Sequence, residues 1–229
     1  MNRLTIILVA IFSLIFTTSA SATPNVELIT SSEVAFTNPI RASRNAAVKI
    51  FSPSGGHGSG IYVTYKKHVG ILTANHVVDE GVIYQITTSD ANVVGAVIWR
   101  DETADLAFLI TAERLDKKPI RLTATAENLE AGTKISYSGY PSSYELLSVT
   151  GHVSGFDERG HLIIQGFGWF GSSGAGIIDD SNRLVGIVTA LPVEEFYGHP
   201  QVLEALILVT PIKKEHITQI GVVLDVLKQ

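Results

Sequence analysis

The chain has 229 residues, of which 45% are hydrophobic and 17% are charged. This is enough to bury a sizeable core in one domain or in two small subdomains. The formal net charge is −5 and the sequence has no cluster of basic residues that could bind the phosphates of nucleic acid, so we expect no nucleic-acid partner. Cysteine is absent, which excludes disulfides and cysteine-ligated zinc and leaves stability to the packed core.

Residues 1–22 have the organisation of a secretory signal peptide. Arg3 gives a basic start, an apolar run extends from Leu4 to Phe16, and Ala20 to Ala22 supply an Ala-x-Ala end after which cleavage is expected. The alternative is an uncleaved anchor, but about thirteen apolar residues are short for a membrane span. We therefore expect an exported protein, periplasmic or secreted, without a stable membrane anchor after cleavage. Its oligomeric state stays open.

Most of the remaining chain has the pattern of β-strands. Residues 23–43 carry two prolines without clear periodicity, and we interpret them as an N-terminal arm. Thereafter, short runs rich in Val, Ile, Tyr and Thr alternate with Gly, Asn, Asp and Pro. Six such runs precede a polar connection at 111–132: Ala46 to Phe51, Gly60 to Tyr65, Val69 to Thr73, Val82 to Thr87, Val93 to Arg100 and Leu106 to Ile110. Six follow it: Lys134 to Gly139, Leu146 to Phe156, His161 to Gln165, Gly176 to Ile178, Leu184 to Ala190 and Leu203 to Val209.

One helix is predicted near the C-terminus. Thr210 and Pro211 have the character of an N-cap followed by proline at the first helical position, and the spacing from Ile212 to about Ile220 is helical. Many short, evenly spaced strands with almost no helix are typical of closed β-barrels or a β-sandwich. The sequence thus predicts an all-β domain over 44–229, with halves at about 44–112 and 132–210 and a helix at about 211–220.

The run GWFGSSGAGII, from Gly168 to Ile178, is a candidate catalytic loop. Its density of small residues allows a tight turn that directs amide hydrogens toward one point, with Ser173 as the nucleophile there. The same composition also suits an ordinary flexible loop. The motif therefore indicates acyl-transfer chemistry only if the chain also supplies a base and a carboxylate.

His76 and Asp105 are the candidates for these two roles. In GILTANHVV, His76 follows an apolar strand at the point where it gives way to a turn. Asp105 opens the apolar run after RDETA, where a carboxylate is costly unless it is hydrogen-bonded, and a histidine ring N–H would satisfy it. A turn-capping role is the alternative for Asp105. The other histidines lie in loops, turns, a strand or the terminal helix and have structural interpretations: His57, His68, His152, His161, His199 and His216.

Together these blocks resemble a trypsin-like serine protease of the chymotrypsin fold, nearest in style to the cysteine-free bacterial exported proteases of the HtrA (Deg) group. The matching motifs are GSGIYV, ILTANHVV, ADLAFL, GSSGAGII and RLVGIVTAL, and they cover about 46–209. The resemblance implies two six-stranded antiparallel β-barrels with the site in the cleft between them. It implies Ser173 as nucleophile, His76 as general base and then acid, and Asp105 as the group that fixes the imidazole tautomer.

The resemblance also implies an oxyanion hole formed by the amides of Gly171 and Ser173. It implies a protein or peptide substrate and calls for no metal and no organic cofactor. The primary specificity pocket would be formed by Phe167 at its base and by Thr189, Ala190 and Leu191 along its wall. Because none of these is charged, we expect cleavage after small or medium apolar residues.

The sequence departs from the family pattern at two positions beside the nucleophile. Ser172 stands where animal digestive relatives carry an aspartate that pairs with a freed N-terminus, so we expect no activation by that ion pair. Ala175 stands where a second glycine is usual and adds a methyl group close to the turn. The chain ends soon after the predicted helix, so we also expect no PDZ domain. As in the family, the hydroxyl of Thr189 is expected to bond Asp105.

Two other functions are compatible with parts of this pattern. A pseudoprotease that binds its partners without cleaving them would use the same double barrel, and Ala175 slightly favours it. An esterase would share the acyl chemistry, but Ser173 does not lie in a Gly-x-Ser-x-Gly motif, and the chain order is not the hydrolase order of Ser, Asp and His. A serine endopeptidase is therefore the leading hypothesis.

Overall fold

The computed structural model describes residues 37–89, 91–123 and 129–227. The expected signal peptide and the first part of the expected arm lie outside this range. Within the described residues, no helix combines the length and the apolar character needed to cross a bilayer.

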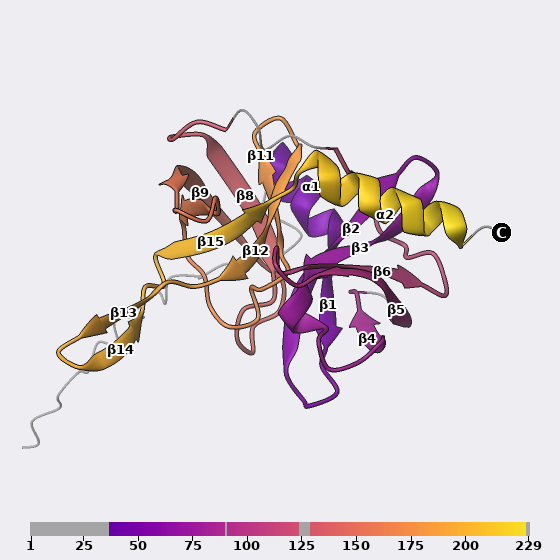
Figure 1. Cartoon of the computed structure of the whole chain (residues 1–229), viewed down its shortest axis with the longest axis horizontal. Helices are drawn as coiled ribbons and strands as arrows, with labels where there is room; N and C mark the ends of the chain where they lie inside the picture. Colours follow the sequence, from indigo (N-terminus) through magenta and orange to yellow (C-terminus); the bar gives the residue numbers. More distant parts are fainter. Residues whose placement is uncertain (1–36, 90, 124–128, 228–229) are drawn as a thin grey trace, which may run out of the picture. The chain divides into compact units, whose positions relative to one another are not determined.

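The first half of the chain forms a closed six-stranded antiparallel β-barrel, barrel 1 (Figure 1). Its strands follow one another in the order β1-β4-β5-β6-β3-β2, and pairing of β1 with β2 closes the ring. A two-residue strand, β7 (Ile120–Arg121), runs parallel to the end of β2. The barrel strands are β1 (Ala47–Phe51), β2 (His57–Tyr65), β3 (His68–Ala74), β4 (Ile83–Thr87), β5 (Asn92–Asp101) and β6 (Leu106–Thr111).

The second half forms another closed six-stranded antiparallel barrel, barrel 2, in the order β10-β15-β12-β11-β8-β9 (Figure 1). The prediction of two six-stranded barrels is therefore confirmed. The strands are β8 (Lys134–Gly139), β9 (Leu147–Phe156), β10 (Leu162–Gln165), β11 (Gly176–Asp179), β12 (Leu184–Ala190) and β15 (Leu206–Pro211).

Each barrel closes around apolar side chains because its strands turn their β-branched and aromatic residues inward. Strand β4 shows this most clearly, since Tyr84 and Ile86 are buried while Ile83 and Gln85, beside and between them, are exposed. Barrel 1 is filled by residues such as Ile50, Ile61, Leu72, Phe108 and Leu109. Barrel 2 has its own cluster, which includes Ile135, Tyr137, Leu162, Ile177 and Val209.

The predicted C-terminal helix is present, but it begins later than expected. Helix α2 spans Lys214–Val226, with Lys213 as its N-cap. Thr210 and Pro211 instead complete strand β15, where Pro211 pairs with Gly186 of β12. Proline is tolerated at the end of a strand because the missing N–H costs little there, so sheet pairing overrides the helix-start signal.

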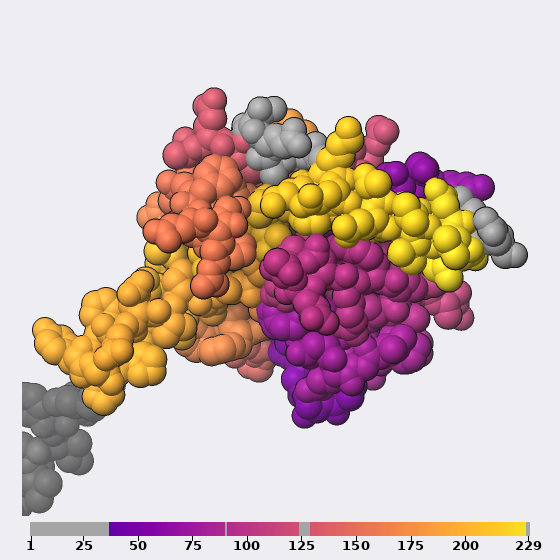
Figure 2. Space-filling view, viewed as in Figure 1, coloured from indigo at the N-terminus to yellow at the C-terminus, as the bar shows by residue number. Residues whose placement is uncertain are grey.

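The elements that were not predicted include a helix and a hairpin. Helix α1 (Asn38–Ala46) falls partly in the expected arm and has a proline in its first turn, where no N–H is needed. Strands β13 (Val193–Phe196) and β14 (His199–Val202) form a separate hairpin between β12 and β15. Figures 1 and 2 show this hairpin projecting from the body of the domain.

The terminal helices cross between the barrels. Helix α1 leads into barrel 1 but packs against β8 and β11 of barrel 2. Its Arg44 donates hydrogen bonds to the carbonyl of Leu146 (3.0 Å) and to Ser148 Oγ (2.9 Å). Helix α2 follows barrel 2 but lies along barrel 1 (Figure 1), where Trp99 Nε1 of β5 donates to Gln219 Oε1 at 3.2 Å. Each helix thus ties its own barrel to the other one.

Candidate active site

His76 and Asp105 are brought together by the pairing of β3 with β6. Ala74, the last residue of β3, pairs with Leu106, the first residue of β6. The short 3₁₀ helix η1 (Asn75–Val77) then carries His76, while Asp105 directly precedes β6. The backbone N–H of Asn75 donates to the carbonyl of Asp105 at 3.1 Å, which fixes the two chain ends side by side.

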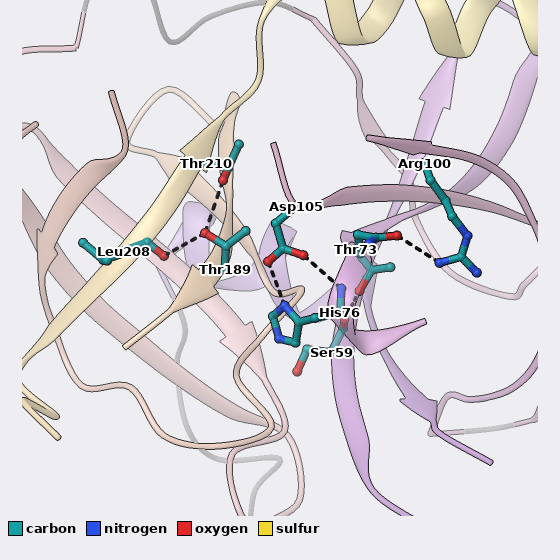
Figure 3. A network of polar contacts seen from close by, with 9 residues as sticks. Ser59, Thr73, His76, Arg100, Asp105, Thr189, Leu208 and Thr210 are labelled. Atoms are coloured by element: carbon teal, nitrogen blue, oxygen red, sulfur yellow. Dashed lines mark hydrogen bonds and ion pairs between the residues drawn. The ribbon is translucent and has the colours of Figure 1, made fainter. Parts of the chain in front are cut away.

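The carboxylate of Asp105 accepts two hydrogen bonds from His76 (Figure 3). The ring Nδ1 lies 2.7 Å from Oδ2, and the backbone N–H lies 2.9 Å from Oδ1. Because a carboxylate accepts, Nδ1 carries the proton and Nε2 is left to act as a base. Asp105 makes these contacts with a left-handed backbone (φ 52°), a strained conformation that aspartate adopts more readily than most residues.

The pKa of His76 is raised above its ordinary value. The hydrogen bond that His76 donates to Asp105 is the largest cause of this rise, desolvation opposes it, and the negative charges of Asp105 and Asp79 add to it. The His76 side chain is 45% exposed, so solvent and a substrate can reach the ring. The imidazole therefore stays protonated to a higher pH than a free histidine.

Arg100 supports this site and was not predicted from the sequence. From β5, it donates to Asn75 Oδ1 at 2.9 Å and to the carbonyl of Gly81. Figure 3 shows Arg100 beyond Thr73, on the side of His76 opposite to Thr189. The contact with Asn75 holds the residue directly before His76. No local sequence pattern links Arg100 to Asn75, which is why the sequence did not reveal this role.

Ser173 lies in a tight turn that precedes β11. The turn is closed by a hydrogen bond from Ser172 N to Trp169 O (2.9 Å), and Gly174 N binds Val188 O of β12 (2.7 Å). Gly171 and Gly174 have φ values of +94° and +88°, in the region where glycine is favoured. The glycines in this run are therefore needed for a defined turn rather than for flexibility.

Gly58 of β2 lies between the nucleophile candidate and the histidine segment. A Cβ atom at Gly58 would lie 2.6 Å from Val77 Cγ2 and 3.1 Å from the carbonyl oxygen of Ser173. The neighbouring N–H of Ser59 donates to that same carbonyl at 2.7 Å. Gly58 therefore lies between the carbonyl of Ser173 and Val77, the residue that follows His76. Among the described residues, no direct hydrogen bond joins Ser173 to His76.

Two backbone amides of the turn are free to bind an oxyanion. Within the described part of the chain, neither Gly171 N nor Ser173 N donates a hydrogen bond. The carbonyl of Phe170 accepts from Ser142 N at 2.6 Å, and in a trans peptide the next N–H, that of Gly171, points the opposite way. An oxyanion hole requires two such donors beside the attacking hydroxyl.

The two departures from the family pattern are accommodated. Ser172 is 1% exposed, and its Oγ accepts a hydrogen bond from Trp169 N at 3.3 Å, so it turns into the protein. Ala175 is fully buried in the core of barrel 2, with its N–H bound to Ser172 O and its carbonyl bound to Val188 N. Its methyl group therefore packs into the barrel without disturbing the turn.

The expected bond between Thr189 and Asp105 is absent from the described hydrogen bonds. Thr189 Oγ1 instead lies 3.2 Å from Thr210 Oγ1 and 3.5 Å from Leu208 O (Figure 3). The reason is a register shift between β12 and β15 at this residue, which turns its side chain toward β15.

The other expected pocket residues lie at the rim of barrel 2. Phe167 is 41% exposed, and its carbonyl accepts from the Tyr137 hydroxyl at 2.6 Å. Ala190 is exposed, and Leu191 is partly buried against the barrel core. Within the described residues, no group of three or more histidines and carboxylates could hold a metal ion.

A double β-barrel with a histidine–aspartate pair on one barrel and a serine in a glycine-rich turn on the other has the architecture of the chymotrypsin-like proteases. The sequence profile of the trypsin-like peptidase domain matches residues 58–187, and the chain belongs to this family. It is accordingly a serine endopeptidase that acts on peptides or proteins.

Solved structures with a similar fold include bacterial proteases. An inactive form of Rv3671c from M. tuberculosis H37Rv has a TM-score of 0.64 and 18% identity, over 81% of this chain and 90% of that one. The serine endoprotease from Yersinia pestis has a TM-score of 0.63 and 20% identity, over 78% of this chain and 64% of that one. The HtrA-type protease AlgW, solved with a tripeptide, has a TM-score of 0.66 and 16% identity, over 81% and 62%. This chain thus spans less than two thirds of the last two proteins. A search of curated protein sequences finds no match.

Proposed function

We propose that this protein cleaves peptide bonds through an acyl-enzyme formed on Ser173, with His76 as general base and acid and Asp105 as its orienting carboxylate. The observation that carries the proposal is the 2.7 Å contact between His76 Nδ1 and Asp105 Oδ2, which leaves Nε2 as the basic nitrogen. Gly58 is close both to the carbonyl of Ser173 and to Val77, the residue after His76, and this proximity supports the same assignment.

The proposed reaction needs only these groups and water. His76 Nε2 takes the proton of Ser173 Oγ as the oxygen attacks the scissile carbonyl, and the resulting oxyanion is bound by the amides of Gly171 and Ser173. The C–N bond then breaks, and His76 gives its proton to the departing amine. Water activated by His76 attacks the acyl-enzyme and releases the new carboxylate. Catalytic hydrogen bonds often tighten only when substrate is bound, so the missing His76–Ser173 bond does not oppose this sequence.

The proposed preference is for small or medium apolar side chains at the cleaved position. It is supported by the uncharged character of Phe167, Thr189, Ala190 and Leu191, because a pocket without a buried charge gains nothing from binding Lys or Arg. A peptide library should return apolar residues at this position. A profile dominated by Arg or Lys would contradict the assignment.

We also propose that the protein is exported after removal of residues 1–22. The basic start, the apolar run and the Ala-x-Ala end support this proposal. Mass spectrometry of the secreted or periplasmic fraction should find a chain beginning at Thr23. An intact N-terminus on protein retained in the cytoplasm would overturn it.

Substitution of the nucleophile tests the function directly. Ser173→Ala should lower kcat by roughly a million-fold, as loss of a catalytic serine does in comparable enzymes, with an unchanged fold by circular dichroism. Ser181→Ala, which removes an exposed hydroxyl from the turn between β11 and β12, should leave the rate unchanged. A wild-type rate in Ser173→Ala would end the proposal. No turnover in the wild-type protein would favour a binding protein instead.

A further inference from the structure

Ser59 occupies an unusual position beside the turn that carries Ser173. It is fully buried in β2. Its hydroxyl accepts the backbone N–H of Tyr140 at 2.9 Å and donates to the carbonyl of Gly171 at 2.7 Å. One side-chain oxygen thus links three segments that are distant in the sequence: β2, the residue after β8, and the turn.

The backbone of Ser59 also contacts this turn. Its N–H donates to the carbonyl of Ser173 at 2.7 Å, and its own carbonyl accepts from Thr73 Oγ1 of β3 at 2.7 Å. Ser59 therefore binds the carbonyl groups on both sides of Ser172. The N–H of Gly174 is anchored separately, to Val188 of β12. Every one of these anchors comes from a barrel strand.

The Ser59 hydroxyl matters because the backbone of Gly171 can change its conformation at little energetic cost. With φ +94° and no Cβ, Gly171 can rotate the peptide groups on either side at little cost. The peptide before it, which contains the Gly171 N–H, is held by the bond from Ser142 N to Phe170 O, and because a peptide is planar this bond orients the N–H directly. The peptide after it is held by two bonds, from Ser172 N to Trp169 O and from Ser59 Oγ to Gly171 O. The Ser59 hydroxyl thus restrains the other side of Gly171, which would otherwise let both peptides turn about its Cα.

Tyr140, whose N–H donates to the Ser59 hydroxyl, is itself held in place. The carbonyl of Tyr140 lies 2.8 Å from His57 Nε2, which must donate because a carbonyl accepts. A Cβ atom at Gly171 would lie 2.4 Å from this carbonyl oxygen and 2.9 Å from His57 Nε2. The segment around Tyr140 is thus held in place, and the turn packs closely against it.

We propose that Ser59 is a positioning residue whose hydroxyl keeps the Gly171 amide aimed at the oxyanion. Ser172 offers no carboxylate with which an ion pair could order this turn, and the Ser59 hydroxyl supplies a neutral bond in its place. The inference rests on the proposed function, in which the amides of Gly171 and Ser173 bind the oxyanion.

The test is Ser59→Ala, with Ser43→Ala as the matched control. Ser43 is also buried, at 1% exposure, and its hydroxyl has no hydrogen-bond partner among the described residues. Ser59→Ala should lower kcat by about 10- to 100-fold, less than the effect of losing an oxyanion donor outright, with KM within about threefold of wild type. Affinity for a peptide aldehyde, whose hemiacetal oxygen occupies the oxyanion hole, should fall by the same factor. Ser43→Ala should leave all three quantities unchanged.

These readouts separate positioning from a structural role. If Ser59→Ala keeps the wild-type kcat, or loses activity only in proportion to the unfolded fraction seen by circular dichroism, the proposal is wrong. Should Ser59→Ala fail to fold, Ser59→Cys fills the same space with a weaker hydrogen-bonding group and should give a smaller loss in kcat with KM unchanged. A wild-type kcat in folded Ser59→Cys would then overturn the proposal.

Failure of this inference can be told apart from failure of the proposed function. Activity that survives Ser173→Ala removes the serine mechanism altogether. Activity that is abolished in Ser173→Ala but unaffected in Ser59→Ala removes only the positioning role.

Discussion

At the scale of single residues, the contact between His76 and Asp105 fixes both the tautomer and the basicity of the imidazole. The carboxylate holds the proton on Nδ1 and raises the pKa of His76. A base must be unprotonated to act, so a raised pKa moves the acid limb of the rate profile to a higher pH than an isolated histidine would give.

Asp105→Asn should therefore change both the rate and its pH dependence. We expect kcat to fall about ten-thousandfold, because an amide can stabilise the wrong tautomer. The residual activity should have its acid limb at lower pH, since the hydrogen bond and the charge that raise the pKa of His76 are gone. The measurement is kcat/KM against pH for both proteins. An acid limb that stays in place or moves upward would show that Asp105 does not set this pKa.

The sequence predicted the residues with distinctive local surroundings and missed those with distant partners. His76, Asp105 and Ser173 each interrupt a strand-like or glycine-rich run, so their positions could be seen in the printed chain. Ser59 contacts Tyr140 and Gly171, which are 81 and 112 residues away. Such a contact exists only after the barrels close, and no spacing rule predicts it.

At the scale of elements, short runs rich in Val, Ile, Tyr and Thr between turn residues predicted the barrel strands well. Strands β8 and β12 have the predicted bounds. The hairpin of β13 and β14 was missed because its residues are exposed on both faces, apart from a partly buried Val202, and include Pro200, which strands usually exclude. An element that buries almost nothing leaves no hydrophobic period in the sequence.

The hairpin should be dispensable for stability. A backbone bond from Leu203 N to Pro192 O, 2.9 Å long, closes its base, and none of its residues belongs to either core. Replacing residues 193–202 with a two-glycine turn should change the thermal midpoint by less than about 3 °C, the equivalent of about 1 kcal/mol in a domain of this size. Differential scanning calorimetry measures this, and a loss of 10 °C or more would mean that the hairpin contributes to the core.

At the scale of the whole domain, the crossing helices should make the two barrels unfold together. Helix α1 binds barrel 2 and helix α2 binds barrel 1, so neither barrel can open without breaking contacts made by the other. The chain has two tryptophans, Trp99 in barrel 1 and Trp169 in the turn region of barrel 2. Each can report on one half.

Trp169→Phe and Trp99→Phe each keep a single tryptophan. In each variant, the urea transition followed by fluorescence should coincide with the transition followed by circular dichroism. Two separate transitions in one variant, with fluorescence and circular dichroism out of step, would show that the barrels unfold independently.

The most direct test of the serine mechanism is to locate the adduct formed with a fluorophosphonate, which phosphonylates an activated serine hydroxyl and releases fluoride. Tandem mass spectrometry of the digested protein should place a single adduct on Ser173, and His76→Ala should abolish its formation. An adduct on a different residue, or labelling of Ser173 that persists at the same rate in His76→Ala, would contradict the assignment of these two residues.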